Sequence, residues 1–271
     1  MRIRRAPALI LTCLLASVIL FPFIYAFLAS FFTAGDFSTI PAPLLPSSWS
    51  LRNYTAIASN RYFPAYVANS VITGLLSAAV RMVLSVLSAY AFSFFRFKGR
   101  RILLSLILLT LFIPSDLLLS GNYMTIQHLG LLDSYLGIIS TSLLPASQIL
   151  MLRQYYCSIP SSIHDSALMD GCGDGRFIIS ILIPLSRAVA GAFFLQSFTS
   201  MFNSYLWPLL VTNRPSMRTV QIGITMLGYA ESLNYGPVFA AIVTVFIPFL
   251  IVFILMRRHL MAVLKQGYMF M

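Results

Sequence analysis

The sequence predicts an all-α membrane protein built as a bundle of six transmembrane helices. Of its 271 residues, 59% are hydrophobic and only 9% are charged, and the mean hydropathy is +0.87, far from the composition of a soluble domain. Six apolar runs have the length of about 20 residues that a helix needs to cross hydrocarbon, and polar or basic clusters bound each of them. Because no linker, repeat or low-complexity segment separates the runs, we expect a single domain over residues 1–271.

The expected spans follow one another along the whole chain. They lie at residues 7–33, 64–95, 102–121, 136–157, 183–206 and 237–257. The first run follows Arg2, Arg4 and Arg5, as in a signal peptide, but it is longer than the 7–15 apolar residues typical of one, so we expect a retained helix that Pro22 bends. The second run is too long to cross upright and should tilt.

The basic residues predict the orientation, since Lys and Arg favour the cytoplasmic side. With both termini in the cytoplasm, 13 of the 18 basic residues lie inside, four lie outside and Arg81 falls within a span. The net charge of +11 is then a consequence of topology. A nucleic-acid interface is disfavoured, because the cations are divided among helix ends instead of forming one face. The stretch Arg257–Met271 is expected to be a cytoplasmic tail.

The residue types that carry metal or nucleophilic chemistry are few and scattered. The three cysteines and three histidines are Cys13, Cys157, Cys172, His128, His164 and His259. No spacing among them suits a metal, no disulfide framework follows, and a Cys172–His164 pair lacks a third orienting group. A GxxxxGK[ST] phosphate loop is also missing from the sequence, so any ATP-driven step needs another chain.

The segment Ile163–Arg176 concentrates charge and glycine in an otherwise apolar chain, with three of the seven acids. Ser162 and Asp165 have the spacing of a capping box, which predicts the start of a short helix. Gly171 can adopt the left-handed conformation that ends one, and Asp174 is positioned to cap the next helix. We therefore expect a short surface helix in loop 158–182, joined by a glycine bend to the fifth span. The alternative is an ordinary polar connection; a capped helix carrying small residues favours a close-fitting face for a partner.

The same segment carries a resemblance to a known family. Asp165-Ser166-Ala167-Leu168-Met169-Asp170-Gly171 resembles the E-A-A-x-x-D-G signature of ATP-binding-cassette (ABC) importer permeases. The segments Leu87–Ala91, Leu132–Tyr135 and Asn203–Leu210 are similar to the carbohydrate-uptake branch of maltose and glycerol-3-phosphate type, and most like its glycerol-3-phosphate permease subunits.

The resemblance implies a type I ABC importer permease fold with a cytoplasmic coupling helix, in a multi-pass protein of the bacterial cytoplasmic (inner) membrane. It implies a non-catalytic subunit without a cofactor of its own, paired with a homologous permease, an extracytoplasmic binding protein and two copies of an ATPase that holds ATP and Mg. It assigns ATPase coupling to Asp165, Ser166, Ala167, Asp170, Gly171 and Cys172. The implied cargo is a sugar or polyol phosphate such as glycerol-3-phosphate, moved by alternating access; a neutral mono- or oligosaccharide is the alternative.

The coupling segment departs from the family pattern at several positions. Asp165 replaces the usual Glu, Ser166 replaces the first Ala and Cys172 replaces the Ala after Asp-Gly. The additional glycines at 173 and 175 each weaken a helix by about 0.5–1 kcal/mol relative to Ala. We therefore expect the helix after the Gly171 bend to be less rigid, and the coupling to be weaker, than is usual in the family.

Polar residues inside the spans are candidates for a substrate path. Arg81 is costly within a membrane, so we expect it to face the bundle, either to attract an anionic substrate or to bond carbonyls or Asp116. On and after the fifth span, polar and aromatic side chains suit hydroxyl-rich ligands, although Tyr and Trp also form interfacial belts. These candidates are Gln196, Ser200, Asn203, Tyr205 and Trp207.

Two other function classes remain open from the residues alone. An ion-coupled secondary transporter needs paired intramembrane acids or inverted halves, and Asp116 is the only candidate acid. A membrane enzyme needs clustered catalytic groups, which the scattered His, Cys and Asp residues do not supply.

Overall fold

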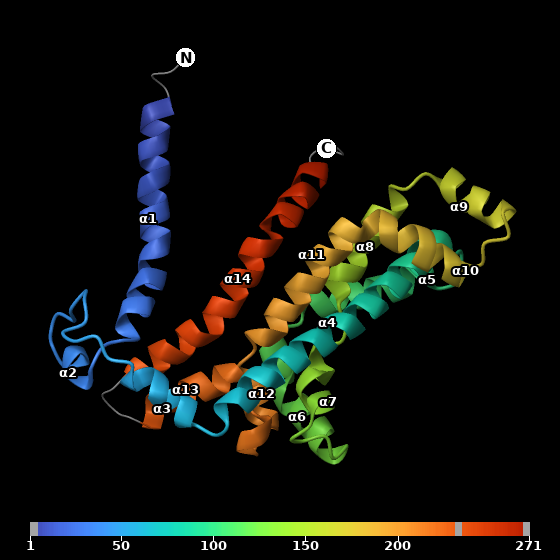
Figure 1. Ribbon diagram of the computed structural model, residues 1–271. Helices are drawn as coiled ribbons and strands as arrows, with labels where there is room; N and C mark the ends of the chain where they lie inside the picture. The colour runs from blue at the N-terminus through green and yellow to red at the C-terminus, as the bar shows by residue number, and fades with distance from the viewer. Residues whose placement is uncertain (1–4, 231–234, 268–271) are drawn as a thin grey trace. The chain divides into compact units, whose positions relative to one another are not determined.

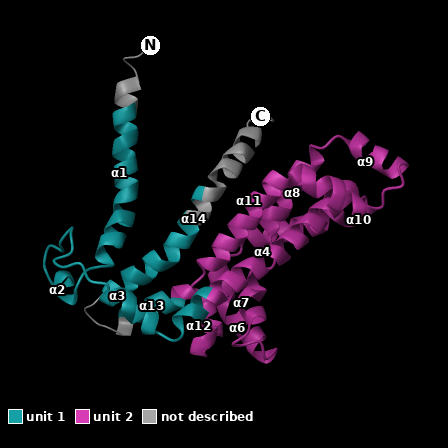
Figure 2. Cartoon of the chain, in the orientation of Figure 1, with its two compact units in different colours: residues 1–67, 222–271 teal, residues 68–221 magenta. Residues whose placement is uncertain are grey.

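The structure is a computed structural model that describes residues 5–230 and 235–267, and every regular element in those residues is helical (Figure 1). Two of the expectations concern residues that the structure does not fully describe. Arg2 and Arg4 of the basic N-terminus lie outside the described residues, and so do the last residues of the tail after Arg257. The chain divides into two compact units, residues 1–67 with 222–271 and residues 68–221 (Figure 2). The single-domain organisation stays a prediction.

The first unit joins the two ends of the sequence. Its helices are α1 (Arg5–Ala29), α2 (Ala34–Phe37), α3 (Arg52–Ser59), most of α13 (Val220–Ala230) and α14 (Gly236–Gly267). α14 packs against α1 and α3, for example through the rings of Phe23 and Phe246, whose centroids lie 5.3 Å apart. The buried amide of Asn53 donates hydrogen bonds of 2.8 and 2.9 Å to the carbonyls of Ser30 and Phe32, which fixes α3 to the end of α1.

The loop after α1 begins with a capping box. The backbone N–H of Thr33 donates to the Asp36 carboxylate at 2.8 Å, and the Asp36 N–H donates back to the Thr33 hydroxyl at 3.4 Å. Hydrogen bonds from the Ser47 hydroxyl and from the Thr33 backbone hold the pKa of Asp36 below its ordinary value of 3.8. Ionised Asp36 therefore stabilises this loop above that pH, and the contribution is lost as the pH falls through the lowered pKa.

The second unit contains most of α4 and all of the helices that follow it up to the start of α13. α4 (Phe63–Phe94) is the longest helix of this unit. The others are α5 (Arg100–Leu109), η1 (Thr110–Phe112), η2 (Ser115–Leu118), α6 (Leu119–His128), α7 (Tyr135–Ile139), η3 (Ser140–Ser142), α8 (Ala146–Cys157), α9 (Ser161–Met169), α10 (Asp174–Phe177), η4 (Ile178–Leu182, a π-helical turn), α11 (Ile183–Phe202), α12 (Leu206–Val211) and η5 (Pro215–Met217).

Three continuous helices among the described residues are long and apolar enough to cross a membrane. They are Leu9–Ala29, Phe63–Phe94 and Asp174–Phe202, where α10, η4 and α11 run on without a break. They occupy the predicted ranges 7–33, 64–95 and 183–206, and the third begins nine residues earlier than expected because the helix already starts at Asp174.

The ranges 102–121 and 136–157, each expected as one span, are bent pairs of helices. Arg100–Phe112 and Ser115–His128 meet at 96°, and the second pair, Tyr135–Ser142 and Ala146–Cys157, meets at 57°. Pro114 and Pro145 lie at the two breaks, where the missing N–H of proline ends the hydrogen-bond ladder. Counted as one span each, the pairs raise the number to five; the described apolar part of α14, Gly236–Leu250, is shorter. The six-span organisation stays a prediction.

Candidate coupling site and substrate path

The start of α9 differs from the expected capping box. α9 begins at Ser161, its N-cap is Pro160, and no side chain caps it. Ser162 therefore lies within the first turn, where its hydroxyl no longer precedes the free backbone N–H groups. The capping-box prediction for Ser162 and Asp165 is wrong because the N-cap is Pro160 and the helix starts at Ser161, two residues earlier than a Ser162 cap requires.

The end of α9 follows the prediction. Gly171 has φ +70°, and its N–H donates to the Leu168 carbonyl at 3.0 Å. The next N–H, of Cys172, reaches back to the Ala167 carbonyl at 2.9 Å. These two bonds form a Schellman motif, which requires a left-handed residue after the C-cap. The role of Gly171 as the bend that closes α9 is confirmed.

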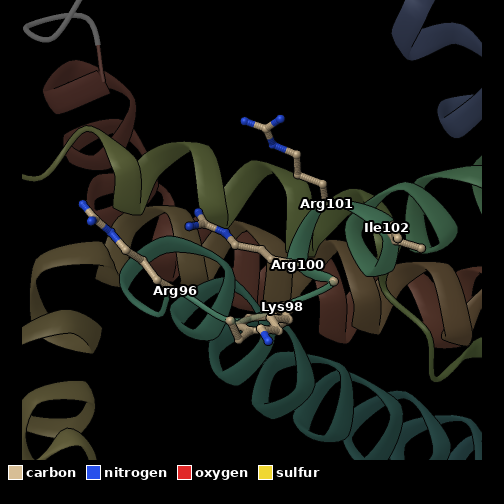
Figure 3. Close-up of a pocket in the computed structure, with 7 residues that line it drawn as sticks. Arg96, Lys98, Arg100, Arg101 and Ile102 are labelled. Carbon is tan, nitrogen blue, oxygen red and sulfur yellow. The ribbon is translucent and has the colours of Figure 1, made fainter.

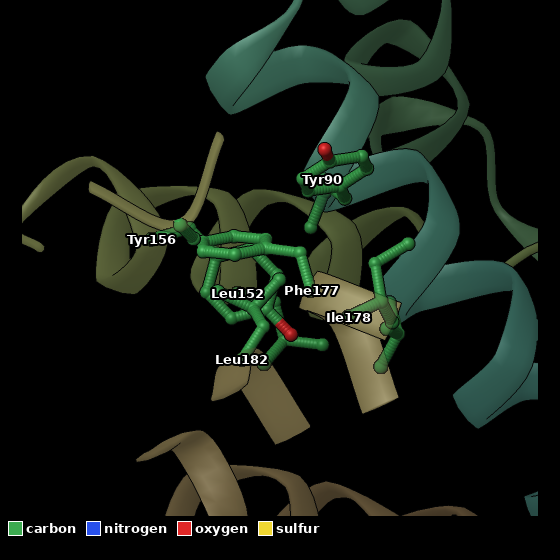
Figure 4. Packing of buried hydrophobic residues seen from close by; sticks show 9 residues of the cluster. Tyr90, Leu152, Tyr156, Phe177, Ile178 and Leu182 are labelled. Carbon is green, nitrogen blue, oxygen red and sulfur yellow. The ribbon is translucent and has the colours of Figure 1, made fainter. Parts of the chain in front are cut away.

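Ala167 attaches α9 to the body of its own unit. Its side chain is only 6% exposed and joins a core in which α4, α8 and the segment from α10 to η4 meet (Figure 4). The other buried members are Val86, Ala89, Tyr90, Leu152, Tyr156, Phe177, Ile178 and Leu182. Since this core includes residues of α4 and of the helix that starts at Asp174, α9 packs against two helices long enough to cross a membrane.

Aromatic packing strengthens this attachment. The His164 ring on α9 packs against the rings of Phe94 and Phe177, at centroid distances of 4.8 and 4.9 Å, and those two rings contact each other at 5.6 Å. The buried Nε2 of His164 has no hydrogen-bond partner in the part of the chain that the structure describes, so ring packing is the contact that holds this side chain. No sequence signal predicted this ring contact, because Phe94 lies 70 residues before His164.

Asp174 has a different role from the predicted helix cap. Gly173 is the N-cap of α10 and no side chain caps this helix. The Asp174 carboxylate instead accepts a 2.7 Å hydrogen bond from the hydroxyl of Tyr90 on α4. The cap prediction is wrong because α10 starts at Asp174 itself and the Tyr90 hydroxyl is a competing donor for its side chain.

The outward face of α9 is open. Asp165, Ser166 and Asp170 are exposed, and Met169 is 91% exposed. Cys172 is half-buried and packs on the core that contains Ala167. The predicted coupling residues thus form two sets. Asp165, Ser166 and Asp170 are exposed, next to the exposed Met169, whereas Ala167 and Cys172 pack on the core and hold the helix.

Arg81 belongs to a polar stripe on α4 in which one position in four is polar. The stripe consists of Asn69, Thr73, Ser77, Arg81 and Ser85. Four of these side chains are buried and hydrogen-bonded: Ser77 to Ser142 at 3.1 Å, Ser85 to Gln148 at 3.3 Å, Thr73 to the Asn69 carbonyl at 2.8 Å, and Asn69 to the Ser216 carbonyl at 2.8 Å. The buried Nε of Arg81 has no hydrogen-bond partner among the described residues, and no salt bridge joins Arg81 to Asp116 there.

The remaining path candidates do not form one cluster. Gln196, Ser200 and Asn203 are exposed and Tyr205 is 38% exposed. Trp207 is buried, and its indole N–H donates to the Gly137 carbonyl at 3.1 Å within a core around Ile138 and Val211. Trp207 therefore packs in this core, and the path role of all five candidates stays a prediction.

Comparison with known proteins identifies the family. Residues 81–262 match the model of the family described as "Binding-protein-dependent transport system inner membrane component". The sn-glycerol-3-phosphate transport system permease protein UgpE of Agrobacterium fabrum is 33% identical over 250 residues, and that of Brucella abortus is 32% identical; each match covers 89% of both chains. The UgpE protein of Yersinia pestis is 32% identical over 249 residues.

A solved structure agrees with these relatives on the fold. It is a bacterial ABC transporter involved in the import of the acidic polysaccharide alginate, and it matches 95% of this chain and 96% of its own with a TM-score of 0.81 at 24% identity. The predicted type I importer permease fold is confirmed, and the named relatives are permeases, which are transport subunits and not enzymes. The chain belongs to the family of binding-protein-dependent transport system inner membrane components, the permease subunits of ABC importers.

Proposed function

We propose that this chain is one of two homologous permease subunits of an importer for a polyol phosphate, glycerol-3-phosphate or a close analogue. The observation that carries the coupling role is the two-sided character of α9. Ala167 and His164 attach the helix to the spanning helices, while Asp165, Asp170 and Met169 face outward for a partner.

The partner on this face is an ATPase, present in two copies, that holds ATP and Mg. When ATP closes the ATPase pair, a groove around α9 moves the helix. The shared core passes the movement to α4, α8 and α11, so the permease changes from inward-facing to outward-facing. A loaded binding protein favours the same conformation, which links substrate arrival to ATP hydrolysis. In this arrangement α9 and both termini lie in the cytoplasm.

The anionic substrate is supported by the names of the relatives and by Arg81. Several relatives at 31–33% identity are named for sn-glycerol-3-phosphate transport, and Arg81 supplies a cation without a salt bridge or Nε hydrogen bond among the described residues. Ser77 and Ser85 lie four residues before and four residues after Arg81 on α4, and Ser85 donates a hydrogen bond to Gln148 on α8. These groups are buried and hydrogen-bonded in this structure, and a bound polyol would take over those hydrogen bonds. A neutral sugar remains the second candidate, because these same groups bind hydroxyls without needing the charge of Arg81.

The test measures ATP hydrolysis by the complete complex in proteoliposomes with its binding protein. We expect glycerol-3-phosphate to stimulate hydrolysis, Arg81→Gln to abolish uptake of the anion, and Arg81→Lys to retain part of it. Stimulation by a neutral sugar and not by glycerol-3-phosphate would favour the second candidate. An equal loss of charged and neutral substrates in Arg81→Gln would assign Arg81 a structural role.

A further inference from the structure

We propose that the loop between α4 and α5 and the exposed face of α5 together bind one anionic phospholipid. The basic loop, residues 96–101, would hold the headgroup phosphate, and the apolar stripe of α5, formed by Ile102, Leu103, Leu106 and Leu109, would hold an acyl chain. The placement of this lipid in the inner leaflet rests on the proposed cytoplasmic position of α9; the binding itself rests on the contacts below.

The basic loop presents three exposed positive charges. Arg96, Lys98 and Arg101 are exposed, and none of them has a salt bridge within residues 5–230 and 235–267. They line an open hollow of about 680 Å³ together with Gly99, Arg100 and Ile102 (Figure 3). Figure 3 shows the side chains of Arg96, Lys98 and Arg101 extending in different directions from the loop. They are exposed, so a headgroup phosphate would draw more than one of them toward it, as in basic pockets at membrane surfaces.

Arg100 differs from its neighbours because its guanidinium is already engaged. It donates hydrogen bonds to the carbonyls of Phe92 and Phe95, at the end of α4. The bend at Gly99, with φ +83°, then starts α5 without a side-chain cap. The backbone N–H of Arg100 donates to the Phe97 carbonyl at 3.4 Å. The rest of the first turn of α5 follows directly after the loop, and the positive end of the helix dipole adds to the attraction for an anion.

The apolar stripe of α5 distinguishes a lipid from a free anion. Ile102 is 67% exposed, and Leu103, Leu106 and Leu109 are 48–56% exposed. Their spacing places them along one side of the helix, starting at the hollow that Ile102 itself lines. Inorganic phosphate would use only the loop, whereas an amphiphilic molecule with a phosphate and a hydrocarbon chain fits both parts.

The loop also lies at the end of α4 where a membrane surface is expected. Phe94, two residues before the loop, contacts His164 on the coupling helix. The basic loop and α9 are therefore at the same end of α4, and a coupling helix in the cytoplasm places the loop at the inner leaflet.

The test uses the assembled transporter in lipid nanodiscs and measures retention of phosphatidylglycerol and cardiolipin against phosphatidylcholine by native mass spectrometry. We expect the variant Arg96→Gln/Lys98→Gln/Arg101→Gln to lower the affinity for anionic lipid by about tenfold or more, since each cation near a surface contributes to attraction. The control Arg52→Gln/Arg61→Gln/Arg214→Gln removes the same amount of charge from three exposed arginines elsewhere and should leave this affinity unchanged. Two of them have partners, since Arg214 pairs with Asp133 at 3.9 Å and Arg61 lies over the Tyr62 ring.

A second variant, Ile102→Ser/Leu106→Ser, separates lipid from free phosphate. It should weaken retention of the lipid while leaving the loop's attraction for inorganic phosphate intact. The proposal would be overturned by unchanged lipid retention in the loop variant, by an equal loss in the control, or by complete displacement of the lipid by millimolar inorganic phosphate. Lost association with the ATPase or second permease at unchanged lipid retention would assign the loop to a protein contact instead. Because retention is measured without transport, failure here leaves substrate-stimulated hydrolysis, and hence the proposed function, independently testable.

Discussion

The coupling helix α9 and the basic loop lie at the same end of α4 but are built in opposite ways. α9 is attached to its unit by the buried Ala167 and by the His164 ring, which packs against Phe94 and Phe177. Two hydrogen bonds close its C-terminal end. The basic loop keeps Arg96, Lys98 and Arg101 in solvent, without a salt bridge in the described residues. A segment that transmits force must be attached firmly to what it moves, whereas a segment that holds a charged ligand must leave its charges free.

Each region contains a glycine with positive φ at a helix end, so the same substitution can be made in both regions and its effect on coupling compared. Gly171 closes α9 at +70° and Gly99 opens α5 at +83°. A Cβ at either glycine would meet nothing within 4 Å, so the strain of a substitution comes from backbone conformation alone. The same chemical change therefore reports how much each region contributes to coupling.

The largest effect is expected at Ala167. Ala167→Leu would overfill a core whose members are almost fully buried, at a cost of about 1–3 kcal/mol, and would detach α9 from α4 and α8. We expect substrate-stimulated ATP hydrolysis in proteoliposomes to fall at least about tenfold. Ser166→Leu, at the exposed neighbouring position, is the control for folding and insertion; an equal loss in both variants would contradict a specific role for the buried side.

Gly171→Val should have the next largest effect. A β-branched residue in the left-handed region costs about 1–2 kcal/mol, which we expect to lower stimulated hydrolysis about fivefold while the protein still inserts. Gly173→Ala is the matched control, because Gly173 has φ −73° and open space around it. Gly99→Val should leave the coupling of hydrolysis to substrate unchanged; a loss equal to that of Gly171→Val would erase the distinction between the two regions.

A smaller effect is expected from Tyr90→Phe. The variant keeps the ring in the core and removes only the 2.7 Å hydrogen bond to Asp174. Bonds to charged groups contribute about 1.5–3 kcal/mol, but Asp174 is exposed and water replaces the lost donor, so we expect a two- to threefold lower stimulated hydrolysis. Asp174→Asn keeps an acceptor for Tyr90 and should be milder; the reverse order would exclude the hydrogen bond as the cause.

The smallest effect on coupling is expected from the basic-loop variant. Arg96→Gln/Lys98→Gln/Arg101→Gln changes no buried contact, so stimulated hydrolysis in lipid of fixed composition should stay within about twofold of the parent chain. Hydrolysis assays with neutral and anionic lipid side by side provide the measurement. A loss comparable to that of Ala167→Leu would show that the loop, too, transmits force.

Among the features that depend on local chemistry, the helical fold and the glycine bend were predicted correctly from the sequence, whereas the capping box at Ser162 and Asp165 was not. Composition and apolar runs predicted the helical membrane fold, and the position of Gly171 predicted the left-handed end of α9, because a bend of this kind has few alternatives to glycine. Ala167 was named as part of a small, close-fitting face for a partner, but its burial against the permease's own core required the fold.

Features that depend on distant partners were not predicted. Asp174 was expected to cap its own helix, but its side chain bonds Tyr90, 84 residues away in the sequence. The hydrogen bond from the Trp207 N–H to the Gly137 carbonyl, 70 residues earlier, also had no signal in the sequence; the path role of Trp207 stays a prediction. Pro114 and Pro145 were the available signals for the two bent pairs, since proline at a break interrupts the backbone ladder.

Cysteine cross-linking tests most directly whether the outward face of α9 docks on the ATPase. In a chain with Cys13, Cys157 and Cys172 replaced by Ser, Met169→Cys places a thiol at a position that is 91% exposed on α9. Ile40→Cys, at a position 99% exposed in the loop before α3, is the control. In an assembled, active complex we predict that Met169→Cys cross-links to the ATPase and Ile40→Cys does not. No cross-link from Met169→Cys, or equal cross-linking from both positions, would contradict the assignment of α9 as the coupling helix.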